Sequence, residues 1–411
     1  EINHAGVGGL WAELVSNRGF EAGGRHSPSI INPWGAIGDE DVISITTELS
    51  SCFESNPIAL RMDVHCNQTT CPPGGVGIYN PGYWGMSIEE GKSYKVVFYV
   101  KSSGPLEGVL SLASEDGTQV LAFERLSVEA DEVNNWTKME VTLKPKASYK
   151  TARLQFTTSQ NGTIWLDQGH GFRTDLMRML EKLKPKFLRF PGGCYVEGNH
   201  VRNAFRWKET VGPWEERPGH FGDNWNYWSD DGLGIGTAKD EQVDSYLIAP
   251  FVQEMLDGIE FARGSANSTW GSLRAKMGHP SPFNLKYVAV GNEACQIQGY
   301  NGYPALRKNY PDIKIISNCD ASQKPLDHPA DLYDYHNYTT AEGMLELTQR
   351  FKKIRRGVPH APKAFVSEYA AFKQTNPSGP FYGGTGTFKG ALAEAAFLLS
   401  LEQNRHVSLI N

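Results

Sequence analysis

Two glutamates, Glu293 and Glu368, each end a short apolar segment, in KYVAVGNE and AFVSE. Other apolar segments, FLRF, IKIIS and DLYDYH, precede the second of these, and a helical pattern of apolar residues covers 344–354. Strands that alternate with helices predict a parallel sheet, here interpreted as a (β/α)8 barrel. Because the carboxyl ends of parallel strands meet on one face, we expect both glutamates to reach one cavity.

A facing pair of carboxyl groups is typical of a glycosidase. Cleavage of a glycosidic bond with retention needs a proton donor and a carboxylate nucleophile about 5 to 5.5 Å apart. Either glutamate alone could instead form a salt bridge or cap a helix, as strand-end carboxylates often do. Their joint position at two strand ends favours the catalytic interpretation.

Several polar residues flank the two glutamates in the predicted barrel. Asn292 directly precedes Glu293, and its amide can hold a sugar hydroxyl beside the acid. His336 and Tyr338 end the strand before the one that carries the second glutamate, although a satisfied buried histidine is an alternative interpretation. Arg189, in FLRFPGGC, supplies a fixed positive charge and five donors suited to a carboxylate or to sugar oxygens.

In the first third of the chain, apolar residues recur with a different spacing. Residues 43–167 contain alternating apolar and polar segments, such as KSYKVVFYVKS and ARLQFTTS, separated by Gly, Asn and Pro. This pattern predicts an antiparallel β-sandwich. Tyr79, Tyr83 and Trp84 lie beside turn residues within it and form either an exposed platform for a glycan or a plug at the end of the sandwich.

Charge and motifs argue against several other functions. The net charge of −6 is spread along 411 residues, and no basic stripe is present that would bind a nucleic acid or an anionic membrane. No apolar run approaches the ~20 residues of a membrane span. His328, Asp331, Asp334 and His336 fall on a loop and a strand rather than on one helical face, which is unfavourable for a metal site. We therefore expect a neutral polar ligand, with no metal, no organic cofactor and no nucleic-acid or membrane partner.

Secretion is expected from two indirect signals, the N-glycosylation sequons and a group of closely spaced cysteines. The chain opens with Glu1 rather than Met, which predicts a mature or trimmed form. Sequons for N-glycosylation stand at Asn67, Asn135, Asn161, Asn267 and Asn337. We expect the last of these to stay unmodified because a glycan there would block the predicted cavity. Three of the six cysteines, Cys52, Cys66 and Cys71, lie close together, and their pairing stays open at the level of sequence.

Several long segments together closely resemble the plant α-L-arabinofuranosidases of glycoside hydrolase family 51. They are INHAGVGGLWAELVSNRGFEAGG, FLRFPGGCYVEG, YVAVGNE, PDIKIISNCDAS, HPADLYDYHNYT and FVSEYA. The resemblance implies a (β/α)8 TIM-barrel catalytic domain, incomplete in this sequence, that is interrupted by an all-β jelly-roll sandwich similar to a carbohydrate-binding module. It also implies retaining exo-hydrolysis of terminal α-L-arabinofuranosyl residues from arabinoxylan and arabinan in the extracellular matrix or cell wall.

The resemblance also assigns roles to residues. Glu293 matches the acid/base and Glu368 the nucleophile. Residues that match positions shaping or lining the sugar pocket are Glu1, Arg189, Cys194, Asn292, His336 and Tyr338. Trp225 and Trp228 match the pocket rim, with core packing as the alternative.

The expected domain boundaries follow from periodicity and resemblance together. They are 1–42 for the N-terminal part of the barrel, 43–167 for the sandwich and 168–411 for the rest of the barrel. Relative to the family pattern, the first strand is mostly absent, one βα unit is missing near Gly234, and the chain ends before the last barrel strand and a C-terminal sandwich. Two alternatives to the arabinofuranosidase stay open: an inactive glycan-binding homologue, and another retaining enzyme of the same clan, similar to a β-xylosidase.

Overall fold

The structure is a computed structural model of the chain, and it divides into two compact units that are described separately. One unit comprises Glu1–Lys184 and Arg206–Ile235, and the other Pro185–Phe205 and Gly236–Asn411. The residues described are 14–23, 30–129, 132–167, 198–200, 203–223, 226–229, 245–291, 302–319, 328–350, 362–372, 387–404 and 408–409, with the single residues 182, 184, 189 and 326.

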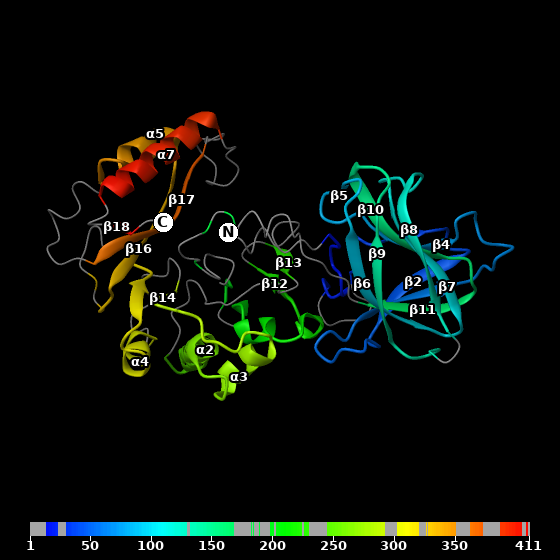
Figure 1. Cartoon of the computed structure of the whole chain (residues 1–411), viewed down its shortest axis with the longest axis horizontal. Coiled ribbons are helices and arrows are strands. Elements are labelled where there is room, and N and C mark those ends of the chain that lie inside the picture. Colours follow the sequence, from blue (N-terminus) through cyan, green and yellow to red (C-terminus); the bar gives the residue numbers. More distant parts are fainter. Residues whose placement is uncertain are drawn as a thin grey trace. The chain divides into compact units, whose positions relative to one another are not determined.

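Two antiparallel sheets form most of the first unit (Figure 1). One sheet has the order β1-β4-β10-β7-β8, with β5 also paired to β10; its strands are β1 (Gly35–Ile37), β4 (Val76–Asn80), β5 (Met86–Ile88), β7 (Leu106–Ala113), β8 (Val120–Val128) and β10 (Tyr149–Thr158). The other has the order β2-β3-β11-β6-β9; its strands are β2 (Ile43–Glu48), β3 (Ala59–Val64), β6 (Tyr94–Ser102), β9 (Thr137–Leu143) and β11 (Gly162–Asp167).

Alternation of side chains explains how these strands build a core. In β3, Leu60, Met62 and Val64 are buried, whereas Arg61 and Asp63 on the opposite face are partly exposed. Apolar side chains from both sheets join one buried cluster, as expected when two sheets pack face to face. The antiparallel sandwich expected from the sequence is thus present.

The sandwich begins earlier than the sequence pattern indicated. β1 lies before residue 43 and pairs with β4, from Gly35 opposite Tyr79 to Ile37 opposite Gly77. Val15 and Phe20 also belong to the buried cluster. A three-residue strand is too short to show alternation, which is why the expected boundary between 1–42 and the sandwich lies too late for these residues.

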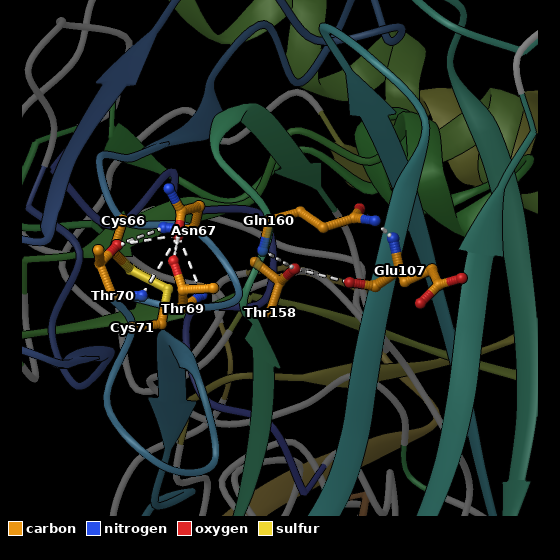
Figure 2. The surroundings of a disulfide bond; sticks show 8 residues. All are labelled: Cys66, Asn67, Thr69, Thr70, Cys71, Glu107, Thr158 and Gln160. Atoms are coloured by element: carbon orange, nitrogen blue, oxygen red, sulfur yellow. Dashed lines mark hydrogen bonds between the residues drawn. A yellow bond between two sulfur atoms is a disulfide. The ribbon is translucent and has the colours of Figure 1, made fainter.

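A disulfide closes a short loop that follows β3. Cys66 and Cys71 are bonded, and Cys52 is a free thiol. Inside this loop the side-chain oxygen of Asn67 accepts hydrogen bonds from the amide and hydroxyl of both Thr69 and Thr70 (Figure 2). The pairing that the sequence left open is therefore between the two nearest cysteines.

A parallel sheet in the order β14-β15-β16-β17-β18 forms the centre of the second unit. Its strands are β14 (Tyr287–Val290), β15 (Lys314–Ser317), β16 (Leu332–Thr339), β17 (Lys363–Ala371) and β18 (Ser408–Leu409). The helices are α2 (Ser245–Arg263), α3 (Thr269–Lys276), α4 (Gly302–Asn309), α5 (Ala341–Leu347) and α7 (Phe388–Gln403). A helix separates β14 from β15, β16 from β17 and β17 from β18, and all neighbouring strands pair in parallel, which confirms the parallel α/β architecture.

Helices α5 and α7 pack together against one face of β16 and β17 (Figure 1). Tyr335, Val366 and Phe397 are buried in this layer. The opposite face of the sheet carries a second apolar group made of Ile316, Leu332 and Phe365. Among the described residues, no helix combines the length and apolar character that crossing a bilayer requires.

Candidate active site

Glu368, on β17, accepts a hydrogen bond at each of its carboxylate oxygens. Arg189 Nη1 donates to Oε1 at 2.7 Å, and the Tyr338 hydroxyl donates to Oε2 at 2.6 Å. The residue is only 9% exposed, so these charge-assisted contacts act where solvent screening is weak. Three residues that the sequence placed in one cavity therefore meet.

The pairing of β16 with β17 explains why Glu368 faces the site. Tyr335 lies opposite Val366, but the next residue, His336, lies opposite Glu368, so Ser367 is an extra residue in β17. This is a β-bulge, which places two consecutive residues opposite one and redirects a side chain. Without it, strict alternation would point Ser367 and Glu368 to opposite faces of the sheet.

Alternation along β16 places Asp334, His336 and Tyr338 on one face of that strand. His336 Nε2 lies 3.0 Å from Asp334 Oδ2 and 2.9 Å from Ser367 Oγ, and its Nδ1 lies 3.6 Å from Glu368 Oε2. The histidine ring thus lies between two buried carboxylates.

Arg189 balances part of this negative charge. Its Nη1 pairs with Glu368, and its Nη2 lies 3.6 Å from Asp334 Oδ2. A guanidinium group has rigidly spaced donors, so it can hold two carboxylates in a fixed relation to one another. The cluster can therefore present one fixed carboxylate to an electrophilic carbon.

Most of the other predicted site residues lie outside the described part of the chain. Asn292 and Glu293 lie outside the described residues, although β14, the strand that leads to them, is in the same parallel sheet as β17. Glu1, Cys194 and Trp225 also lie outside the described residues. Trp228 lies in β13 (Tyr227–Ser229), which pairs with β12 (His220–Gly222) in the unit that contains the sandwich.

Asp334 and Ser367 are site residues that the sequence did not single out for this role. Asp334 was considered only as a possible metal ligand, yet it stands two residues before His336 on the same strand face. Side-chain alternation along a strand could therefore have predicted from the sequence that Asp334 lies on the same face as His336. Ser367 had no such signal, because the bulge that turns it toward His336 is a property of strand pairing.

No group of three or more His, Cys, Asp or Glu residues that could hold a metal ion occurs in the part of the chain that the structure describes. His328, one of the four residues considered above, lies 2.7 Å from Ser317 Oγ and stacks on Tyr303. His336 is engaged with Asp334 and Ser367 as described.

Comparison with known proteins finds α-L-arabinofuranosidases by family model, by sequence and by structure. Residues 179–238 and 235–356 match the family model described as the alpha-L-arabinofuranosidase 1 domain. Alpha-L-arabinofuranosidases 1 and 2 of Arabidopsis thaliana are each 55% identical over 442 aligned residues, covering 99% of this chain and 64% of their own length. A probable alpha-L-arabinofuranosidase A of Aspergillus terreus is 28% identical, over 99% of this chain and 69% of its own length.

A solved structure is also similar over nearly the whole chain. The arabinose-bound MgGH51 α-L-arabinofuranosidase has a TM-score of 0.85 and 27% identity, covering 99% of this chain and 72% of that one. The chain spans a little under two thirds of the length of its Arabidopsis relatives. In sequence and fold the chain is thus similar to α-L-arabinofuranosidases, among them one whose solved structure is described as GH51.

Proposed function

We propose that the protein is a retaining α-L-arabinofuranosidase that removes terminal non-reducing α-L-arabinofuranosyl residues from arabinose-containing cell-wall polysaccharides such as arabinoxylan and arabinan. The observation that carries this proposal is the buried Glu368 carboxylate, fixed at one oxygen by Arg189 and at the other by Tyr338. The 55% identity to two curated arabinofuranosidases supports the choice of sugar.

The reaction proceeds by double displacement. Glu368 attacks the anomeric carbon while Glu293 donates a proton to the departing glycosidic oxygen, giving a covalent arabinosyl-enzyme. Glu293 then takes a proton from water, which attacks the same carbon and releases arabinose with retained configuration. Arg189 and Tyr338 hold the Glu368 side chain in place through the hydrogen bonds that they donate to its two oxygens. Asn292, Glu1 and Cys194 contribute to the pocket, and Trp225 and Trp228 to its rim.

The proposed scaffold is a (β/α)8 barrel interrupted by a jelly-roll sandwich. The parallel sheet of alternating strands and helices supports the barrel, and the two packed antiparallel sheets support the sandwich. In such a barrel β14 and β17 are separated by two strands, so their carboxyl ends direct Glu293 and Glu368 toward one face.

Hydrolysis of p-nitrophenyl α-L-arabinofuranoside by the purified chain tests the function, with thermal unfolding recorded in parallel. We expect release of nitrophenol, its loss in Glu368→Ala, and its return with inverted configuration when azide replaces the missing carboxylate. A cooperatively folded chain without activity would contradict the proposal. Preference for p-nitrophenyl β-xyloside would instead support the β-xylosidase-like alternative.

A second variant tests the acid/base. Glu293→Ala should spare aryl substrates far more than polysaccharide, because a good leaving group needs no protonation. Equal losses on both substrates would show that another residue donates the proton.

Glycan binding by the sandwich is a second candidate function, favoured by one exposed aromatic residue. Trp84 is 80% exposed, and its ring lies 6.1 Å from that of the half-buried Tyr83. This exposure favours a platform over a plug. Trp84→Ala should weaken retention on an arabinoxylan gel without changing hydrolysis of the aryl substrate; unchanged retention would exclude this role.

We further propose that the protein is a secreted glycoprotein of the cell wall. The Cys66–Cys71 disulfide supports an oxidising compartment, and the sequon Asn67 lies exposed in the loop that it closes (Figure 2). Asn337, by contrast, lies half-buried on β16 between His336 and Tyr338. Digestion of the native protein with an N-glycosidase, followed by peptide mapping, should reveal a glycan at Asn67 and none at Asn337.

A further inference from the structure

The bulge in β17 brings a serine and a glutamate from consecutive positions onto the same histidine. Ser367 Oγ lies 2.9 Å from His336 Nε2, and Glu368 Oε2 lies 3.6 Å from His336 Nδ1. A regular strand could not do this, since neighbouring side chains would point to opposite faces. Because of the bulge, the two ring nitrogens of His336 each face a different residue of β17.

The serine hydroxyl also reveals where the histidine proton lies. Ser367 Oγ is 2.5 Å from Asp334 Oδ1, and an ionised carboxylate can only accept, so the single hydroxyl proton is donated to Asp334. The hydroxyl oxygen is then left as an acceptor toward His336 Nε2. Asp334 Oδ2, 3.0 Å from the same nitrogen, is a second acceptor. Two acceptors at one nitrogen require that Nε2 carries a proton.

The opposite ring nitrogen faces the nucleophile. The described charged or titratable groups around the ring are Asp334 and Tyr338 on its own strand, Glu368 on β17, and Arg189. Glu368 would draw a ring proton to Nδ1 if nothing opposed it, because the two atoms are close and the site is buried. Asp334, closer to the ring and held by Ser367, opposes that transfer.

We propose that Asp334 and Ser367 are positioning residues that hold His336 in the Nε2–H tautomer, so that Nδ1 stays an acceptor for a sugar hydroxyl beside the nucleophile. This inference rests on the proposed arabinofuranosidase function. An anomeric carbon in position for attack lies about 3 to 3.5 Å from the Glu368 carboxylate. A hydroxyl on the adjacent ring carbon is then within reach of Nδ1, and hydrogen bonds at that position strengthen in the transition state.

A matched pair of serine variants tests the proposal by kinetics. Ser367→Ala removes an acceptor and frees the Asp334 carboxylate, so kcat on p-nitrophenyl α-L-arabinofuranoside should fall about tenfold with little change in KM. Ser367→Thr keeps the hydroxyl and should recover most of that loss. Ser400→Ala is the control: Ser400 is also buried in this unit and donates to the Thr348 carbonyl at 2.5 Å, so its loss should lower stability and leave kcat unchanged.

The tautomer itself is read from nitrogen NMR of 15N-histidine-labelled protein, with the His336 signal assigned by its absence in His336→Gln. The wild type should show a protonated Nε2. Asp334→Ala, if folded, should populate the Nδ1–H form because Glu368 then attracts the proton, and Ser367→Ala should shift the population in the same direction.

A wild-type Nδ1–H tautomer would overturn the proposal. So would an unchanged tautomer population together with unchanged kcat in Ser367→Ala. The NMR spectra can be recorded without substrate turnover. If the wild type shows the expected tautomer but does not hydrolyse the substrate, only the proposed function is refuted. If it is active but shows the Nδ1–H tautomer, only this inference is refuted.

Discussion

At the scale of single residues, the proposed function depends on how firmly the Glu368 side chain is held. Both of its oxygens accept a hydrogen bond, from Arg189 and from Tyr338. Hydrogen bonds to a charged group are stronger than those between neutral groups, and the Glu368 carboxylate that accepts them is only 9% exposed. The side chains around the carboxylate should therefore affect the rate more than they affect folding.

Tyr338→Phe removes the hydroxyl that donates to Glu368 Oε2. A lost hydrogen bond of about 1.5–3 kcal/mol to a charged group corresponds to a fall in kcat of about 10- to 100-fold. Steady-state kinetics on the aryl arabinofuranoside measure this. Tyr335→Phe, on the same strand but in the helix-facing layer, is the control and should retain kcat. Equal effects of the two changes would contradict the assigned role of Tyr338.

At the scale of elements, one buried arginine joins α3 to the end of α2 and to the turn that follows α3. Arg274 is 1% exposed and donates to five backbone carbonyls, those of Phe261, Ala262, Gly264, His279 and Pro280. Carbonyls that lack internal partners at the end of a helix are satisfied in this way by a side chain. The charge is buried because the surrounding backbone supplies acceptors.

Arg274→Ala removes one donor from each of these carbonyls and opens a cavity. We expect the free energy of unfolding to fall by about 3 kcal/mol or more. Denaturant unfolding followed by circular dichroism measures the change. Lys276→Ala, at the exposed end of the same helix, should change stability by less than about 0.5 kcal/mol. A loss for Arg274→Ala as small as that for the lysine would refute the structural role.

The start of α7 offers a second test at this scale. Thr387 is the N-cap residue, and its hydroxyl accepts from the Gly390 amide at 3.0 Å. Thr387→Ala should cost about 1 kcal/mol of unfolding free energy, whereas Thr387→Ser should cost little because it keeps the acceptor. Thermal unfolding of the two variants compares them directly; a serine variant as unstable as the alanine one would assign the loss to packing instead.

At the scale of the whole molecule, both units contain carboxylates whose charge favours the folded state. In the sandwich, burial raises the pKa of Asp63, but hydrogen bonds from Thr163 and Arg61 lower it more, so that the net shift is downward. In the parallel unit, burial likewise raises the pKa of Asp331, and hydrogen bonds from the Ile315 amide and Arg307 outweigh it. Both units should therefore lose stability in acid.

Asp331→Asn tests this pH dependence. A carboxyl group with a lowered pKa in the folded state contributes stability above its ordinary pKa of 3.8, and that contribution is lost as pH falls through the folded value. The variant should therefore be less stable than wild type at pH 7, and the difference should shrink below about pH 4. Thermal unfolding from pH 7 to pH 2 measures it; a constant difference would show that the carboxylate charge contributes nothing.

Local patterns were sufficient to predict much of the fold and part of the site. Alternation in 43–167 predicted the sandwich, and the change to helical spacing predicted the parallel α/β unit. The strand ends predicted that His336, Tyr338 and Glu368 would meet, because a parallel sheet brings such ends together regardless of sequence separation. Family resemblance supplied the roles.

The sequence by itself therefore determined where the longer strands lie, since this depends on side-chain periodicity along the chain. Tertiary structure alone decided what depends on pairing between segments. Three features are of this kind: the bulge that turns Ser367 toward His336, the Cys66–Cys71 pairing and the carbonyl partners of Arg274. They depend on the register between strands and on which backbone groups still lack a hydrogen-bond partner once the segments have packed. No residue pattern records these choices, because each is made by two segments in contact.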